Sequence, residues 1–428
     1  MKYARIVFVF LAASFLTMAQ GYCQQPVHLA AADRGTVPSS LFNLNILGIS
    51  DRTGWPSMPF ASWRSFHFNW NDVEPAKDRW DFARPDHDVQ EALKHHVDLL
   101  AILETIPAWA ASAEEASNPA KQIARPAALS AWADYVRTVA QRYKGQIHYY
   151  ELWNEPMGVG TFLRDPSALT ALNRVAYETL KSVDPTIVVL SPALSSGDPV
   201  ADRPLRNVRS FGDAGIWKHS DVVAYHFYVA PVTGSTTPRT PEELLPYISA
   251  VKAKMKQAGV QKPLWSTESG WYVLNDDQNP EAAPWYLGKG VEPDLGAAYL
   301  ARTYILGWTA GLDRIYWYCW RHGYMGLTQY GGGDKAPGIA FATIQRWLVG
   351  AQLNSCDRNK DGNWLCQLKR ADGSSAVISW TEASSAQLDV DPAWNAHRYW
   401  TLDGQGHDLG DQASIQISGS PVFLPSSR

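Results

Sequence analysis

Apolar strand-like runs and stretches of helical spacing take turns along most of this chain. Runs such as Val97–Glu104, His148–Trp153 and Asp221–Tyr228 alternate with helix-like stretches such as Leu129–Tyr143. Apolar strands joined by helices are typical of a parallel sheet that is covered on both faces. About eight such units favour a closed barrel over an open sheet. The pattern therefore predicts an α/β fold, a (β/α)8 TIM barrel spanning residues 36–350.

The sequence after residue 350 has a different texture. Short alternating runs are separated by Asp-Gly pairs at 361–362 and 372–373, which favour tight hairpins. We predict a small antiparallel β-sandwich over residues 351–428, with a disulfide between Cys356 and Cys366 across its first hairpin. The segment 357–362 (DRNKDG) also resembles the start of a calcium loop, but Leu368 occupies the position that needs Glu. A hairpin turn is the preferred interpretation, and no metal is expected.

The first residues have the pattern of an export signal. Lys2 and Arg5 precede the apolar run Ile6–Leu16, and small residues follow at Ala19 and Gly21. The run is shorter than the ~20 residues of a transmembrane helix. We predict a signal peptide over residues 1–21 and a secreted or periplasmic protein, in which disulfides are permitted. Whether Cys23 is retained or lipidated stays open.

Composition excludes several classes of function. The formal net charge is −4 and there is no basic block, so neither nucleic acid nor an anionic membrane surface is an expected partner. The sequence has no Gly-rich nucleotide motif, no HExxH and no Cys/His cluster, so no cofactor is expected. The 19 Trp residues suit core packing and also stacking on flat ligand faces.

Two glutamates stand where predicted barrel strands end. Glu155 lies in YELWNEP (150–156) and Glu268 lies in PLWSTESGW (263–271). Because the strand ends of a barrel meet at one mouth, both carboxyls should face one site. Two facing carboxyls are the minimal set for cleaving a glycosidic bond. Other side chains near this mouth are predicted to contact a carbohydrate: Arg64, Asn154, His226, Tyr228, Trp317, Trp320 and Trp109.

These motifs make the chain resemble a clan A glycoside hydrolase, closest to family 39. The resemblance rests on WRSFHFNWNDVEP (63–75), ETIPAWA (104–110), YYELWNEP (149–156), YHFY (225–228), PLWSTESGW (263–271) and WYCW (317–320). It implies a retaining two-glutamate mechanism, with Glu155 as acid/base and Glu268 as nucleophile. It implies that Asn154 binds the sugar 2-hydroxyl. It also implies that an N-terminal strand, here within 26–35, completes the β-sandwich.

The chain departs from the family pattern in places. Met157 stands where family members often carry Asn, and TESGW resembles the endo-acting, exopolysaccharide-cleaving branch more than the xylosidases. Families 5 and 30 share the same two-glutamate logic and remain alternatives, as does a carbohydrate-binding protein without catalysis. The sugar, its linkage and endo or exo action are not predicted, nor is the oligomeric state.

The proposed division of labour predicts different environments for the two glutamates. Glu155 should have a raised pKa, through burial and the nearby Glu268 anion. Glu268 should stay ionised, helped by Arg64 and by Tyr228 or His226. Of the other carboxylates near strand ends, Glu74 is expected to brace a loop and Glu151 to bond within the core.

Overall fold

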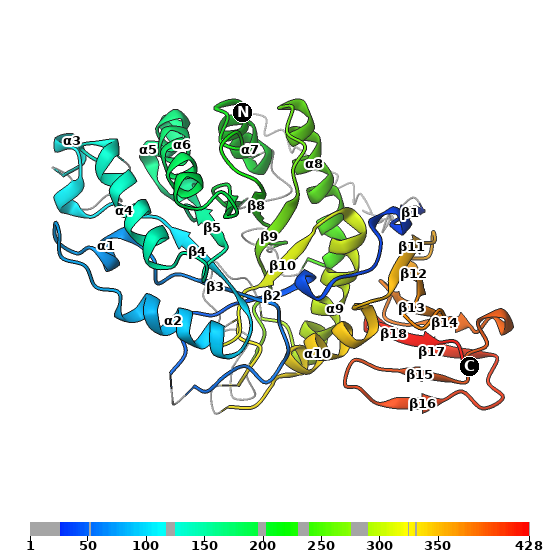
Figure 1. Ribbon diagram of the computed structural model, residues 1–428. Coiled ribbons are helices and arrows are strands. Elements are labelled where there is room, and N and C mark those ends of the chain that lie inside the picture. The colour runs from blue at the N-terminus through cyan, green and yellow to red at the C-terminus, as the bar shows by residue number, and fades with distance from the viewer. Residues whose placement is uncertain are drawn as a thin grey trace, which may run out of the picture.

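The computed structural model describes residues 26–50, 53–116, 125–195, 203–229, 239–274, 290–323, 325–329 and 332–427. A barrel with helices around it occupies most of this range, and a separate β domain lies beside it (Figure 1). The predicted signal peptide and Cys23 lie outside the described residues.

Parallel strands form the barrel. The sheet order is β6-β5-β4-β3-β2-β10-β9-β8-β7. The strands are β2 (Phe42–Asn45), β3 (Ser62–Ser65), β4 (Asp98–Leu103), β5 (Tyr149–Leu152), β6 (Val188–Leu190), β7 (Leu194–Ser195), β8 (Val223–His226), β9 (Leu264–Ser269) and β10 (Arg314–Trp317).

The two edges of this sheet belong to one stretch of chain. β6 ends at Leu190 and β7 begins at Leu194, so the strand that borders β5 continues directly into the strand that borders β8. Between them, the Ser191 amide donates to the Val222 carbonyl at 2.9 Å. The sheet therefore closes on itself, and the predicted barrel is confirmed.

Helices cover the outside of the barrel (Figure 1). They are α2 (Ala83–Lys94), α4 (Leu129–Arg142), α6 (Pro166–Val183), α7 (Arg203–Asp213), α8 (Leu244–Gln257), α9 (Pro293–Ala310) and α10 (Ala336–Leu348), with short helices α1 (Trp70–Val73), α3 (Ala113–Ala116) and α5 (Gly160–Arg164) in the loops. In α4, Trp132, Val136 and Val139 recur at helical spacing, and all three are buried. Helix α9 is buried along nearly its whole length and also contacts strands of the β domain.

The β domain has two layers. Its main sheet is antiparallel, in the order β1-β11-β12-β13-β18-β15-β16. These strands are β1 (Val27–Ala30), β11 (Gln352–Arg358), β12 (Asn363–Lys369), β13 (Ser375–Thr381), β15 (Arg398–Trp400), β16 (Gly406–Asp408) and β18 (Val422–Pro425). The second layer pairs β14 (Ala386–Asp389) with β17 (Ser414–Ile417). Apolar side chains such as Val377, Ile415 and Leu424 are buried together between the layers.

The first hairpin of this domain carries the disulfide. Cys356 and Cys366 lie opposite each other on β11 and β12, with Cα atoms 4.0 Å apart, and are bonded. The Asn359 side chain accepts the backbone amides of Asp361 and Asn363, each at 2.9 Å. These bonds close a tight turn at DRNKDG, in line with the hairpin interpretation.

The N-terminal strand belongs to the β domain. β1 runs antiparallel to β11, with Val27 opposite Arg358. In Figure 1 it is the blue strand beside the orange ones.

The β domain packs against the side of the barrel. Arg302 of α9 pairs with Glu242 and donates to the Gly419 carbonyl at 3.2 Å. The Trp347 ring of α10 stacks on Phe423 with centroids 5.2 Å apart. Within the described residues, no helix is long and apolar enough to cross a membrane.

Candidate active site

The structure brings the two predicted glutamates together. Glu155 follows β5, Glu268 lies in β9, and His226 ends β8 between them in the barrel order. One ligating atom from each of these three side chains lies within 4.8 Å of the other two. This spacing would allow them to share a cation, and it also places both carboxylates within reach of one reacting bond.

Glu268 is held from two sides. Its side chain is only 8% exposed. Arg64 Nη1 donates to Oε1 at 2.6 Å, and the Tyr228 hydroxyl donates to Oε2 at 2.7 Å. Burial and the Glu268 charge raise the pKa of Tyr228 well above its ordinary value, so the hydroxyl remains a donor.

Arg64 donates hydrogen bonds to several side chains of the site. Its side chain is fully buried. Nε and Nη2 donate to Glu151 at 3.3 and 2.5 Å, Nη2 also donates to Asn154 Oδ1 at 2.8 Å, and Nη1 donates to Asn45 Oδ1 at 3.0 Å as well as to Glu268. A guanidinium has five N–H donors, and these contacts use them all. The Arg64 side chain therefore supports its neighbours, and a direct contact with substrate stays a prediction.

The turn that carries Glu155 has an uncommon backbone. Trp153 and Glu155 have φ of 78° and 43°, a left-handed conformation that costs a side-chain-bearing residue of order 1–3 kcal/mol. Neighbouring strands fix this turn. Trp153 N donates to Leu103 O, and Glu155 N donates to Ala193 O, at 3.0 and 3.1 Å. Pro156 then begins a 3-10 turn, Pro156–Gly158, which directs the chain away from the strand.

Glu155 is more open than Glu268. Its side chain is 41% exposed, and Oε1 lies 2.9 Å from His226 Nδ1. Burial raises the pKa of Glu155. Four interactions lower it by more than burial raises it: a hydrogen bond with His226, the charge of His226, a hydrogen bond with Ser195 and the charge of Arg64. The pKa of Glu155 therefore lies below its ordinary value. The prediction of a raised pKa is wrong, because sequence reasoning did not place the His226 donor on Glu155.

His226 lies close to both glutamates and is not exposed to solvent. Its side chain is fully buried, and Nδ1 also lies 3.6 Å from Glu268 Oε2. Asn154 is half-buried beside the pair, so its predicted contact with a sugar hydroxyl stays a prediction.

The aromatic side chains at the end of the last barrel strand differ in exposure. Trp317 is 0% exposed and Trp320 is 3% exposed, and the Trp317 ring stacks on Trp271 with centroids 5.8 Å apart. Both rings pack in the core, and a sugar contact by either one stays a prediction. The half-buried ring at this strand end is Tyr318, whose pKa is raised by burial and by charges that include Glu268 and Glu155. Tyr318 stands between the two Trp residues in WYCW, directly after the end of β10.

Trp109 has a mixed environment. It is half-buried, packs edge-on against Trp70 with centroids 5.7 Å apart, and donates from Nε1 to Glu74 O at 2.9 Å. Glu74 itself accepts from Trp70 Nε1 and from the Asp78 amide, at 2.8 and 2.9 Å, which fits a loop brace. A sugar contact by Trp109 stays a prediction.

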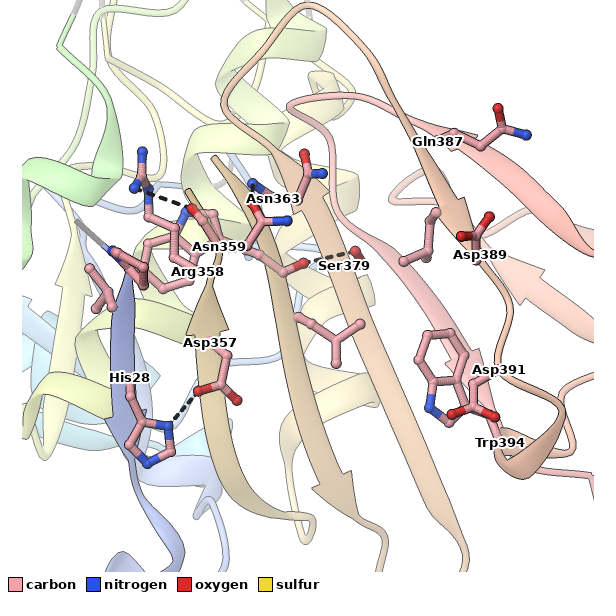
Figure 2. Close-up of a pocket in the computed structure, with 15 residues that line it drawn as sticks. His28, Asp357, Arg358, Asn359, Asn363, Ser379, Gln387, Asp389, Asp391 and Trp394 are labelled. Carbon is pink, nitrogen blue, oxygen red and sulfur yellow. Dashed lines mark hydrogen bonds and ion pairs between the residues drawn. The ribbon is translucent and has the colours of Figure 1, made fainter. Parts of the chain in front are cut away.

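A separate cavity lies in the β domain (Figure 2). It has a volume of about 650 Å³, and its lining includes Leu365, Asp389 and Trp394. His28 of β1 pairs with Asp357 of β11 at one side of it. Neither Glu155 nor Glu268 lines this cavity, so the carboxylate pair at the barrel strand ends is the better candidate for chemistry.

Solved structures that are similar to this chain include glycoside hydrolases. A family 39 glycoside hydrolase from the gut symbiont Bacteroides cellulosilyticus WH2 matches 91% of this chain and 81% of its own, with a TM-score of 0.67 and 20% sequence identity. The fold is that of glycoside hydrolase families 39 and 30. A family 39 β-xylosidase from Caulobacter crescentus matches 93% of this chain and 99% of its own, with a TM-score of 0.58 and 14% identity.

The family 30 likeness is of the same kind. The catalytic domain of family 30 xylanase C from Talaromyces cellulolyticus matches 86% of this chain and 88% of its own, with a TM-score of 0.55 and 14% identity. No protein-family model matches the sequence. The similarity of this chain to families 39 and 30 therefore rests on its fold.

Proposed function

We propose that the protein is an exported, retaining glycoside hydrolase that cleaves O-glycosidic bonds in an oligo- or polysaccharide. The observation that carries this proposal is the approach of Glu155 and Glu268, with one carboxylate oxygen of each within 4.8 Å of the other. An oxygen pair this close favours retention, because the two carboxyl groups as wholes lie about 5–5.5 Å apart in retaining enzymes and ~6.5–9.5 Å apart in inverting enzymes, which must admit a water molecule.

In the first step of the proposed reaction, a Glu268 oxygen attacks the anomeric carbon while Glu155 donates its proton to the leaving glycosidic oxygen. The sugar is then bound to Glu268 as an ester. In the second step, Glu155, now a carboxylate, takes a proton from water as the water oxygen attacks the same carbon. This attack releases the sugar with its original anomeric configuration and restores both carboxyl groups.

The surroundings of each carboxylate support these roles. Arg64 and Tyr228 each donate to one oxygen of Glu268, which fixes the position of the carboxylate that attacks. The greater exposure of Glu155 gives it access to solvent protons. Because the pKa of Glu155 is lowered in the free protein, its protonated form is populated at acidic pH, and we expect an acidic optimum.

Two further features of the chain bear on location and substrate. The disulfide Cys356–Cys366 suits an oxidising compartment, which agrees with the signal peptide predicted for residues 1–21. Xylosides and xylans are the first substrates to test, because similar folds include a β-xylosidase and a xylanase. Bacterial exopolysaccharides come next, because the sequence TESGW (267–271) resembles the branch that cleaves them.

The test is a panel of 4-nitrophenyl glycosides and polysaccharides, assayed with the wild type and with Glu268→Gln. For any substrate cleaved, proton NMR of the first product formed reads its anomeric configuration. We expect turnover by the wild type alone, with retention. Inversion would refute the retaining mechanism, and binding without turnover across the panel would favour a carbohydrate-binding protein.

A further inference from the structure

A third carboxylate meets the turn that carries Asn154 and Glu155. Glu104 directly follows β4 and is 8% exposed. Its Oε2 accepts the backbone N–H of Asn154 at 3.2 Å. A carboxylate at this depth is uncommon unless it has a partner, and this one reaches across from the neighbouring strand.

The amide that Glu104 holds lies at the most constrained point of the turn. Asn154 stands between Trp153 and Glu155, both left-handed, with φ of 78° and 43°. Its side-chain oxygen accepts from Arg64 Nη2 at 2.8 Å. Asn154 is thus fixed by its side chain from β3 and by its backbone from Glu104.

Glu104 is fixed in turn by its own surroundings. Its carbonyl accepts the Trp70 amide at 3.0 Å and the Thr105 hydroxyl at 2.6 Å. Four ionisable side chains from other elements interact with its carboxyl group: Arg64 of β3, Glu151 of β5, Glu268 of β9 and Tyr135 of α4. Burial raises the pKa of Glu104 to about 7, although the Asn154 amide and Arg64 act in the opposite direction.

We propose that Glu104 is a positioning residue, whose carboxyl oxygen holds the Asn154 amide and so fixes the left-handed turn that aims the Glu155 carboxyl. This inference rests on the proposed function for its catalytic meaning. The positioning of the turn does not rest on the proposed function, because Glu104 accepts the Asn154 amide whatever the protein binds. Loss of the acceptor leaves the Asn154 N–H without its partner on Glu104, and movement of the turn would relieve this loss.

Three variants separate the acceptor from the charge. Glu104→Gln keeps a carbonyl oxygen at the same reach and removes the charge. Glu104→Asp keeps the charge but is one methylene shorter. Glu104→Leu keeps the approximate volume and removes the acceptor. Glu74→Gln is the matched control, because Glu74 is also a buried carboxylate that accepts a backbone amide, that of Asp78, but in a loop.

The first readout is the ratio of kcat/KM on a 4-nitrophenyl glycoside to that on the corresponding unactivated disaccharide. A misplaced acid penalises the poor leaving group most. We expect this ratio to rise about ten-fold or more in Glu104→Leu and Glu104→Asp, and to remain near the wild-type value in Glu104→Gln. Glu74→Gln should lower the unfolding temperature without changing the ratio.

The second readout is independent of activity. Hydrogen–deuterium exchange of peptides that contain the Asn154 amide should be faster in Glu104→Leu and Glu104→Asp than in wild type and Glu104→Gln. Wild-type exchange in Glu104→Asp, the variant most compatible with folding, would overturn the inference. So would an unchanged substrate ratio in an active enzyme. An inactive wild type would instead refute the proposed function, and the exchange result would still decide the role of Glu104.

Discussion

The end of β9 and the turn after β5 each present a glutamate to the same site, but they hold it in opposite ways. Glu268 lies within strand β9, is 8% exposed and receives donors from Arg64 and Tyr228. Glu155 stands on a left-handed backbone, is 41% exposed and contacts His226. In the proposed mechanism Glu268 must hold a fixed position as the nucleophile, while Glu155 must exchange a proton with solvent.

This contrast predicts that the two glutamates fail in different ways. The largest effect is expected for Glu268→Ala, because no glycosyl-enzyme can form without the attacking oxygen. Turnover should fall on the order of 10⁴-fold or more on activated and unactivated substrates alike. Steady-state assays on both substrates check this. Loss confined to one substrate class would contradict the assignment of Glu268 as nucleophile.

Glu155→Ala should show the opposite pattern. General acid catalysis contributes about 10²–10⁴-fold, so we expect a loss of that size on an unactivated disaccharide. On a 4-nitrophenyl glycoside, whose leaving group needs no proton, the loss should be much smaller, and azide should restore part of the second step. Equal losses on both substrates, with no azide rescue, would show that the two roles are wrongly divided.

Tyr228→Phe tests how firmly Glu268 is held. The hydroxyl bond to a charged group is worth about 1.5–3 kcal/mol, which predicts a loss of roughly 10- to 100-fold in kcat/KM. Tyr304→Phe is the control, because Tyr304 is also a buried tyrosine but bonds weakly to a backbone carbonyl at 3.4 Å. Similar kinetics for the two variants would argue against a special bond at Glu268.

The smallest expected effect is a shift in pH dependence. His226 lowers the pKa of Glu155, so His226→Ala should raise that pKa. Glu155 can act as an acid only while it is protonated, and it loses its proton as the pH rises through its pKa. The alkaline limb of kcat/KM should therefore move to higher pH in His226→Ala. His95→Ala, which removes a ring stacked on Trp55, is the control and should leave the limb in place. A shift to lower pH would contradict the contact seen between His226 and Glu155.

Much of the architecture could be predicted from the sequence because it depends on periodicity. The barrel strands alternate with helices whose apolar spacing is plain in segments such as Leu129–Arg142. The Asp-Gly turns mark the hairpins of the β domain in the same local way. The meeting of Glu155 and Glu268 followed from barrel geometry, since strand ends converge whatever the sequence between them.

The features that could not be predicted depend on contacts between strands that no local pattern records. The sequence around Arg64 does not show that its side chain is occupied, because its five hydrogen bonds go to partners that lie far away in the sequence. Trp317 and Trp320 are buried in the core, whereas the half-buried ring at this strand end belongs to Tyr318. The pKa of Glu155 was misjudged because burial was considered and the His226 donor was not.

The pairing of β1 with β11 has a consequence for the order in which the molecule forms. Val27 is among the first described residues, and its partner Arg358 follows the whole barrel. During synthesis β1 therefore emerges without a partner and has to wait until β11 has been made. Joining two segments so distant in an unfolded chain carries an entropic cost that grows with the intervening length. Because a folded barrel already fixes the positions of its ends, β1 docking is expected to be a late step that ties the finished barrel to its neighbouring domain.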